Sequence, residues 1–385
     1  MKKVQKIIIF LLLIMILTGC TGNNVFLNIT ADNSQPYWNI LTHNFAKGES
    51  GYYFMDTENK CLMHFNPADK ELTPVCNKEN CSHNDENCYA YLDPMVYIPV
   101  SVWYYKGYIY LLKYDDGNVV LVQVNKNGDE KKDLCIIGSA DVISNKYNIV
   151  FHDDCIYIYN TSINDMMDKK STNYIKKISL NGEINEIIYE NKNDNIMINT
   201  AKSYGSNLFF TVENIEIDSG NKNNLSIRFD SLGLFSYDYN TGKIETVLDK
   251  KVYDYTIDVN NKILYYYVIN EGLYKMNWET KEETKIYESD NDSVLCNISC
   301  DSKNIYMSNE RWYRFNNRNE NNSIKSYMWA ISPDGEIKNK IESFGVYFGD
   351  ENYIFGEIAD SNGIKSAYID KNDIEKVNQW TLIKP

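Results

Sequence analysis

Three cysteines and one histidine that could ligate a metal lie within a segment of thirteen residues. They are Cys76, Cys81, His83 and Cys88, in the pattern C-x4-C-x-H-x4-C. Thiolate sulfur and imidazole nitrogen are typical ligands of closed, tetrahedral zinc sites. The segment is rich in Asn and Asp and has little apolar core of its own, so a bound metal would supply folding energy. It is therefore a candidate structural zinc site.

Two other states of the same cysteines fit the sequence. In an exported protein two of the three can form a disulfide, with Cys61 as a further partner. They can also stay free thiols, and the spacing differs from the C-x2-C of common zinc ribbons. We expect no catalysis from Cys81 with His83, because a nucleophilic pair also needs an orienting group. Metal, disulfide and free thiols remain three alternatives.

The composition and the missing motifs argue against several functions. The chain has 385 residues, with 53 acidic against 39 basic side chains and a net charge of −14, which argues against a nucleic-acid binder. G-x-S-x-G, P-loop, G-x-G-x-x-G and H-E-x-x-H motifs do not occur. We therefore expect a binding protein and no enzyme. The alternative is a polysaccharide lyase or glycosidase, which a carboxylate pair about 5–9 Å apart would favour.

The amino terminus has the pattern of an export signal. Lys2, Lys3 and Lys6 precede the unbroken apolar run Ile7–Leu17. Eleven apolar residues are too few to span a bilayer, but they suit the hydrophobic region of a signal peptide. We therefore expect the mature protein to lie outside the cytoplasm.

The apolar run ends in Leu17-Thr18-Gly19-Cys20, which resembles a bacterial lipobox. The resemblance implies a signal peptide over residues 1–19, cleavage before Cys20, and acylation of the Cys20 sulfur with palmitate-like chains. Two acyl chains anchor a protein stably where one is marginal. Residues 20–36 would then be a tether, and the body would lie at the cell surface, on the extracytoplasmic face of the cell membrane.

A short apolar-aromatic strand recurs seven times along the rest of the chain, at intervals of about 50 residues. Its aromatic anchors are Phe54, Tyr110, Tyr157, Phe209, Tyr265, Tyr306 and Phe355. Most copies continue with two further strands joined by a tight turn, and another strand precedes each anchor. The turns include Asn127-Gly128, Asn181-Gly182, Thr241-Gly242 and Asp334-Gly335. Asn-Gly and Asp-Gly favour two-residue hairpins in which both turn positions have positive φ.

Four antiparallel strands per repeat make one propeller blade, so the sequence predicts an all-β, seven-bladed β-propeller over residues 37–385. Six or eight blades are the alternatives, because the spacing of the copies is loose. Residues 75–105 would form a Cys/His-containing loop between the first and second blades. We expect this loop to lie as a flap over the mouth of the central channel.

Most anchor rings are expected to fill the wedge-shaped gaps between blades. Five other aromatic residues lie near strand ends or in irregular loops and are candidates for binding a ligand, for example by stacking on sugar rings. They are Trp103, Tyr104, Tyr105, Trp312 and Tyr313. The expected ligand is a glycan, a peptide or a protein, and the expected state is a monomer.

One repeat carries a family resemblance. Ile263-Leu264-Tyr265-Tyr266, followed by Gly272-Leu273-Tyr274-Lys275-Met276-Asn277, resembles the YWTD-type propeller repeat. It is more similar still to repeats of uncharacterised surface lipoproteins of low-GC Gram-positive anaerobes. No copy contains Tyr-Trp-Thr-Asp, so the ligand roles of YWTD receptors do not carry over.

The cysteine segment matches a P-x-C-N-x3-C-x-H…C segment of the same lipoproteins. The matching residues are Pro74, Cys76, Asn77, Cys81, His83 and Cys88. The resemblance implies a lipid-anchored propeller and gives no function for the segment.

Overall fold

The computed structural model describes residues 45–56, 58–93, 95–139, 147–160, 173–191, 196–221, 224–290, 295–309, 326–360 and 363–384. Within these ranges the only helical element is a single 3₁₀ turn, η2 (Lys371–Asp373). No helix in them has the length and apolar character needed to cross a bilayer. The expected signal peptide, tether and lipid-bearing Cys20 lie outside the described residues.

The described residues form seven antiparallel sheets, each built from four strands that are consecutive in the sequence. The first four sheets contain β1 (Phe45–Lys47), β2 (Tyr52–Asp56), β3 (Cys61–Asn66) and β4 (Glu71–Pro74); β5 (Tyr97–Tyr105), β6 (Tyr108–Asp115), β7 (Asn118–Asn125) and β8 (Lys131–Ser139); β9 (Tyr147–His152), β10 (Cys155–Asn160), β11 (Asn173–Ser179) and β12 (Asn185–Asn191); and β13 (Ile196–Tyr204), β14 (Asn207–Asn221), β15 (Asn224–Asp238) and β16 (Ile244–Leu248).

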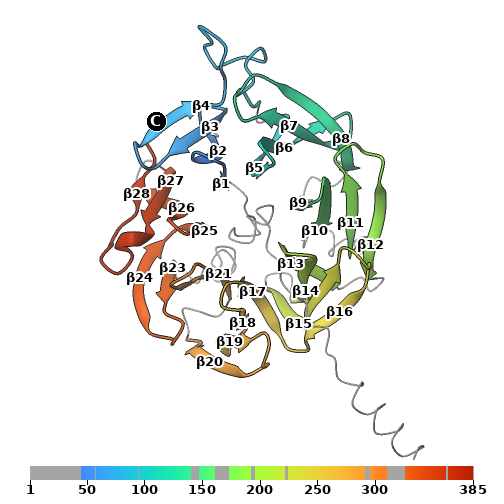
Figure 1. The fold of residues 1–385 in the computed structure, drawn as a ribbon, viewed down its shortest axis with the longest axis vertical. Coiled ribbons are helices and arrows are strands. Elements are labelled where there is room, and N and C mark those ends of the chain that lie inside the picture. The colour runs from blue at the N-terminus through green and yellow to red at the C-terminus, as the bar shows by residue number, and fades with distance from the viewer. Residues whose placement is uncertain are drawn as a thin grey trace, which may run out of the picture.

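The last three sheets contain β17 (Val252–Asp258), β18 (Ile263–Val268), β19 (Gly272–Asn277) and β20 (Glu283–Glu288); β21 (Cys296–Cys300), β22 (Ile305–Asn309), β23 (Ser326–Ile331) and β24 (Ile337–Ser343); and β25 (Gly345–Gly349), β26 (Tyr353–Asp360), β27 (Gly363–Asp370) and β28 (Thr381–Leu382). Figure 1 shows these sheets arranged as a ring, with the first strand of each towards the centre and the fourth at the perimeter. The sheets are therefore the blades of a propeller, numbered here 1 to 7 in chain order.

The recurring aromatic strand is the second strand of every blade. Its seven anchors fall on β2, β6, β10, β14, β18, β22 and β26, and all seven side chains are buried. The prediction of seven blades is thus confirmed, and six or eight blades are excluded by the seven sheets. In all seven sheets this strand lies between the first and third strands of its own blade.

The turns between third and fourth strands differ from the expected two-residue hairpins. Gly128 has a φ of +69°, whereas Asn127 is not among the residues with positive φ. The Gly128 N–H donates to the carbonyl of Asn125 at 2.8 Å, which closes a four-residue turn with the glycine in its last position. Only the glycine therefore needs the left-handed region. Gly182, Gly242 and Gly335 likewise have positive φ, whereas Asn181, Thr241 and Asp334 before them do not.

Aromatic rings join the first blade to the last. Phe45 of β1 stacks on Phe54 of its own blade and on Phe355 of β26, with ring centroids 4.8 Å apart in both pairs. Lys47 Nζ lies 2.5 Å from Asp350 Oδ2 in blade 7, and the Tyr52 hydroxyl donates to the same oxygen at 2.7 Å. Among the described strands each of these two blades uses only its own consecutive strands. Among the described residues, side chains therefore make the contacts between the first and last blades.

Candidate metal centre

The cysteine segment lies between β4 and β5, at the outer edge of blade 1. β4 pairs only with Met63–Asn66 of β3, which leaves the beginning of β3 without a neighbour on that side. The returning chain takes this place: the Leu62 N–H donates to the Ala90 carbonyl and the Leu92 N–H to the Lys60 carbonyl, both at 2.8 Å. Figure 1 shows the segment at the perimeter of the ring, away from its centre.

The expected flap over the channel mouth is therefore wrong. The backbone groups that β4 leaves unpaired on β3 hold residues 90–92 at the rim. The irregular part of the expected loop also ends early, because Tyr97–Tyr105 is the innermost strand of blade 2. The sequence placed the segment correctly between blades 1 and 2 but not at the axis.

Cys76, Cys81, His83 and Cys88 converge on one point. Their three sulfur atoms and one imidazole nitrogen all lie within 4.8 Å of one another. His83 Nδ1 lies 3.3 Å from Cys88 Sγ. Cys88 is fully buried and the other three are partly buried. None of the eight cysteines in the described residues takes part in a disulfide.

Tight backbone turns bring these four side chains together. Asn80 and His83 adopt left-handed conformations, with φ of +56° and +57°. The Cys88 N–H then donates to the Asp85 carbonyl at 3.0 Å, and the Asp85 carboxylate accepts from the Asn87 N–H at 2.9 Å. Asn and Asp support such turns because their short side chains bond to nearby backbone. The abundance of Asn and Asp in the segment thus serves its folding.

Backbone N–H groups point at two of the sulfur atoms. Burial opposes ionisation of Cys76. Hydrogen bonds to its sulfur from the Lys78 N–H and from the thiols of Cys88 and Cys81 outweigh burial and lower the pKa of Cys76. Burial raises the pKa of Cys88 to about 12, and the N–H groups of Ala90 and Tyr91 oppose that shift. N–H donors stabilise a thiolate in preference to a thiol.

Blade 2 holds the segment from the other side. Lys131 Nζ of β8 donates to the Tyr91 carbonyl at 3.0 Å and to the Cys88 carbonyl at 3.5 Å. The Asn77 N–H donates to the Gly128 carbonyl at 3.2 Å. A Cβ at Gly128 would lie 2.6 Å from the Cα of Cys76, so only glycine permits this close approach. The Asn-Gly turn between β7 and β8 therefore also forms the surface against which the cysteine segment packs.

The aromatic ligand candidates in β5 belong to the blade packing. Trp103 and Tyr105 are each only 3% exposed, and Tyr105 stacks on Phe151 of blade 3 with ring centroids 5.1 Å apart. Tyr104 is partly buried and stacks on Tyr53 of blade 1 at 5.5 Å. Because Trp103 and Tyr105 are buried, neither ring has an exposed face on which a sugar could stack. Trp312 and Tyr313 lie outside the described residues, so their role stays a prediction.

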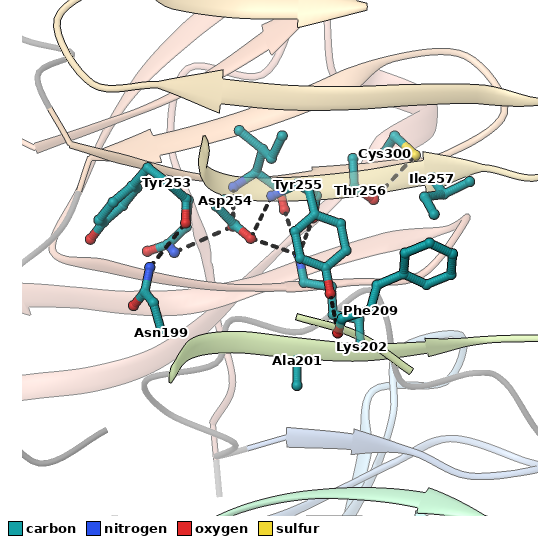
Figure 2. Close-up of polar contacts among 12 residues, drawn as sticks. Asn199, Ala201, Lys202, Phe209, Tyr253, Asp254, Tyr255, Thr256, Ile257 and Cys300 are labelled. Atoms are coloured by element: carbon teal, nitrogen blue, oxygen red, sulfur yellow. Dashed lines mark hydrogen bonds and ion pairs between the residues drawn. The ribbon is translucent and has the colours of Figure 1, made fainter. Parts of the chain in front are cut away.

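A buried charged cluster was not anticipated from the sequence. Lys202 of β13 lies 3.0 Å from the carboxylate of Asp254 in β17, and its ammonium also donates to the Tyr255 carbonyl at 2.5 Å. Asp254 accepts the N–H of Ile298 in β21 at 2.8 Å. Figure 2 shows the lysine end and the carboxylate facing each other between the inner strands. One ion pair thus connects blades 4, 5 and 6.

The cluster extends through Asn199 to a second buried carboxylate, Glu213. Asn199 donates its amide to the Tyr253 carbonyl at 2.9 Å and to the Glu213 carboxylate at 3.1 Å. Asn199 lies at a bulge of β13, where the pairing with β14 shifts between Ile198 and Ala201. Bulges turn side chains out of the regular alternation. The arrangement is a network of hydrogen bonds within blade 4 and between blades 4, 5 and 6.

Comparisons with known proteins gave matches only among solved structures. No protein-family model matches the chain, and no curated protein sequence matches it. Similar solved structures include an oligogalacturonate lyase in complex with manganese, with 8% identity over 70% of this chain and 72% of that chain and a TM-score of 0.46. BamB from Moraxella catarrhalis gives 9% identity, coverages of 84% and 83%, and a TM-score of 0.43. Sqt1 from Saccharomyces cerevisiae gives 9% identity, coverages of 92% and 100%, and a TM-score of 0.41. The class of protein, a seven-bladed β-propeller, rests on the strand topology itself.

Proposed function

We propose that the chain is a lipoprotein of the extracytoplasmic face of the cell membrane whose propeller binds a glycan, a peptide or a partner protein without catalysis. The observation that carries the proposal is the lipobox-like Leu17-Thr18-Gly19-Cys20 in front of a seven-bladed body. A propeller holds its blade-connecting loops on a rigid ring, and rigidly positioned loops are the usual place of binding residues. A protein of net charge −14 would be repelled by an anionic envelope, so the lipid would hold it there.

Replacing Cys20 with serine is expected to move the protein from the membrane fraction to the soluble fraction, because the acyl chains supply the binding to the bilayer. The measurement is fractionation of cells that express each form, together with metabolic labelling by a clickable fatty acid. Cys135→Ser serves as the control, since it changes a cysteine in β8 and leaves the lipobox intact. A wild-type protein that carries no label, or that washes off the cells in buffer, contradicts the anchor.

The binding role is tested with the lipidated protein in its own membranes. Cross-linking and affinity purification should recover a specific protein partner, or a glycan array probed with the Cys20→Ser chain should give saturable binding. Bound polysaccharide should be recovered at its original length. Release of new reducing or unsaturated sugar ends would instead support a glycosidase or a lyase.

A further inference from the structure

We propose that Cys76, Cys81, His83 and Cys88 bind one structural Zn²⁺, and that this ion fixes the segment 76–92 to the outer rim between blades 1 and 2. This inference is independent of what the propeller binds. The cysteine alternatives that the sequence leaves open are metal, disulfide and free thiols, and the geometry of the segment favours the first.

The separations of the donor atoms match a tetrahedral ion. With usual bond lengths of about 2.3 Å to sulfur and about 2.0 Å to nitrogen, the ligands of a tetrahedral zinc lie roughly 3.5–3.8 Å apart. His83 Nδ1 lies 3.3 Å from Cys88 Sγ, and no two of the four donor atoms are more than 4.8 Å apart. A small inward movement of the side chains therefore suffices to bind the ion.

A disulfide explains less of the arrangement. It would join two of the sulfur atoms at about 2.05 Å. The third sulfur and the His83 imidazole would then share the same space without a role. Zinc uses all four donors and closes the site without an open position, as in structural sites of the Cys3His type. Cys61 lies next to the site but outside the group of four converging ligand atoms, and its thiol donates to the His83 carbonyl at 3.4 Å.

The surroundings suit an ion with three thiolates. Zn²⁺ with three thiolates and a neutral imidazole carries a net negative charge, which nearby cations stabilise. The Lys131 ammonium lies against the carbonyls of Cys88 and Tyr91. The Lys78 ammonium donates to the Asn87 carbonyl and lies 4.0 Å from the centre of the Tyr89 ring. Both lysines are thus held close to the site by neutral partners.

The segment has little else to order it. Residues 77–80 and 84–87 are exposed, and Cys88 and Ala90 are the fully buried residues between 76 and 90. So small an apolar core cannot offset the entropy of ordering a loop of this length. The thiols lose their protons to solvent as the ion binds, and the binding energy becomes folding energy of the segment. Residues 90–92 then pair with the beginning of β3 and complete the edge of blade 1.

The test uses the full chain with Cys20→Ser, purified without chelator. We expect one zinc per chain by elemental analysis, and thiols at the site that react with a thiol reagent only after a chelator is added. Replacement of zinc by Co²⁺ should give the visible bands of tetrahedral cobalt and a sulfur-to-cobalt charge-transfer band. Cys81→Ser and His83→Ala should each lower Co²⁺ affinity by more than about 100-fold, beyond the effect of an outer residue.

Cys135→Ser and Cys61→Ser are the matched controls and should keep both the zinc and the cobalt spectrum. A deficit of titratable thiols that a chelator does not restore would show a disulfide and overturn the proposal. Thiols that all react at once, with no metal in the protein and no cobalt spectrum, would overturn it as well. The cobalt titration of the unmodified site decides the question even where a ligand variant fails to fold.

Lys131 is expected to act as a positioning residue for this site. Lys131→Met should weaken Co²⁺ binding by about 10-fold, within the usual range for residues that orient metal ligands. Lys131→Arg should restore most of the affinity, since it keeps the charge and the donors. Lys132→Met is the control, because Lys132 is exposed and pairs with Glu130. Equal affinities for Lys131→Met and Lys132→Met would remove this role.

Discussion

Replacing Asp254 with alanine is expected to lower the free energy of unfolding by about 3–5 kcal/mol, the usual cost of breaking a buried ion pair from one side. Asp254 and Lys202 are only 3% and 4% exposed at their side chains. Alanine would leave the lysine charge buried beside the Tyr255 carbonyl and ring, without the carboxylate that balances it. It would also remove the acceptor of the Ile298 N–H in the next blade. The measurement is urea unfolding followed by the near-ultraviolet signal of the aromatic core.

An exposed pair provides the control. Lys243 and Glu245 lie 2.5 Å apart with side chains 65% and 42% exposed, so Glu245→Ala should change the unfolding free energy by less than about 1 kcal/mol. The double variant Lys202→Met with Asp254→Leu should be more stable than Asp254→Ala, because it leaves no unpaired charge. Asp254→Ala as stable as Glu245→Ala would mean that the pair does not hold blades 4, 5 and 6 together.

The fold could be predicted because its signals are local. Phe209 and Tyr265 each pack into a different core cluster from the residues on either side of them in the strand. Glycines such as Gly128 mark the turn between the third and fourth strands. Each such signal lies within a few residues of sequence, and seven copies reinforce one another. The number of blades follows from counting the copies.

The candidate site and the charged cluster depend on distant residues. The segment was predicted at the channel mouth because nothing near Cys76 reveals that Ala90 pairs with Leu62 of β3. Lys202 is a single lysine in the buried strand Ile196–Tyr204, and its partners in β17 and β21 lie 52 and 96 residues further along the chain. A lysine in an inner strand with an aspartate in the next inner strand is a signal that repeat alignment could have found.

Replacing Asp350 with asparagine is expected to weaken the closure between the first and last blades in a pH-dependent way. Burial opposes ionisation of Asp350, but hydrogen bonds from Lys47 and Tyr52 and from the Asn352 N–H outweigh it and lower its pKa below the ordinary range of an aspartate. Charged hydrogen bonds of this kind contribute about 1.5–3 kcal/mol each at most. At neutral pH we expect Asp350→Asn to cost about 1–3 kcal/mol of unfolding free energy.

The sign of the pH dependence follows from the direction of the shift. A carboxyl whose pKa is lower in the folded state stabilises the fold above its ordinary pKa and loses that contribution as pH falls through the folded pKa. The difference in stability between wild type and Asp350→Asn should therefore be constant above about pH 5 and shrink below about pH 4. Other carboxylates titrate equally in both proteins, so the difference isolates this one.

The groups around Asp350 give the matching variants. Tyr52→Phe removes one hydrogen bond and keeps the ring, and Lys47→Met removes the ion pair of the half-exposed lysine. Lys371, which donates to the Asp350 backbone carbonyl at 2.5 Å and pairs with Asp301 at 3.1 Å, stays in place in both. Each variant should lose part of the pH-dependent difference, because each removes one cause of the lowered pKa. A stability difference that stays the same from about pH 7 to about pH 3 would mean that the Asp350 charge does not help to close the ring. Closure would then depend on the aromatic contacts between the two blades, such as Phe45 on Phe355 and Tyr52 on Phe355.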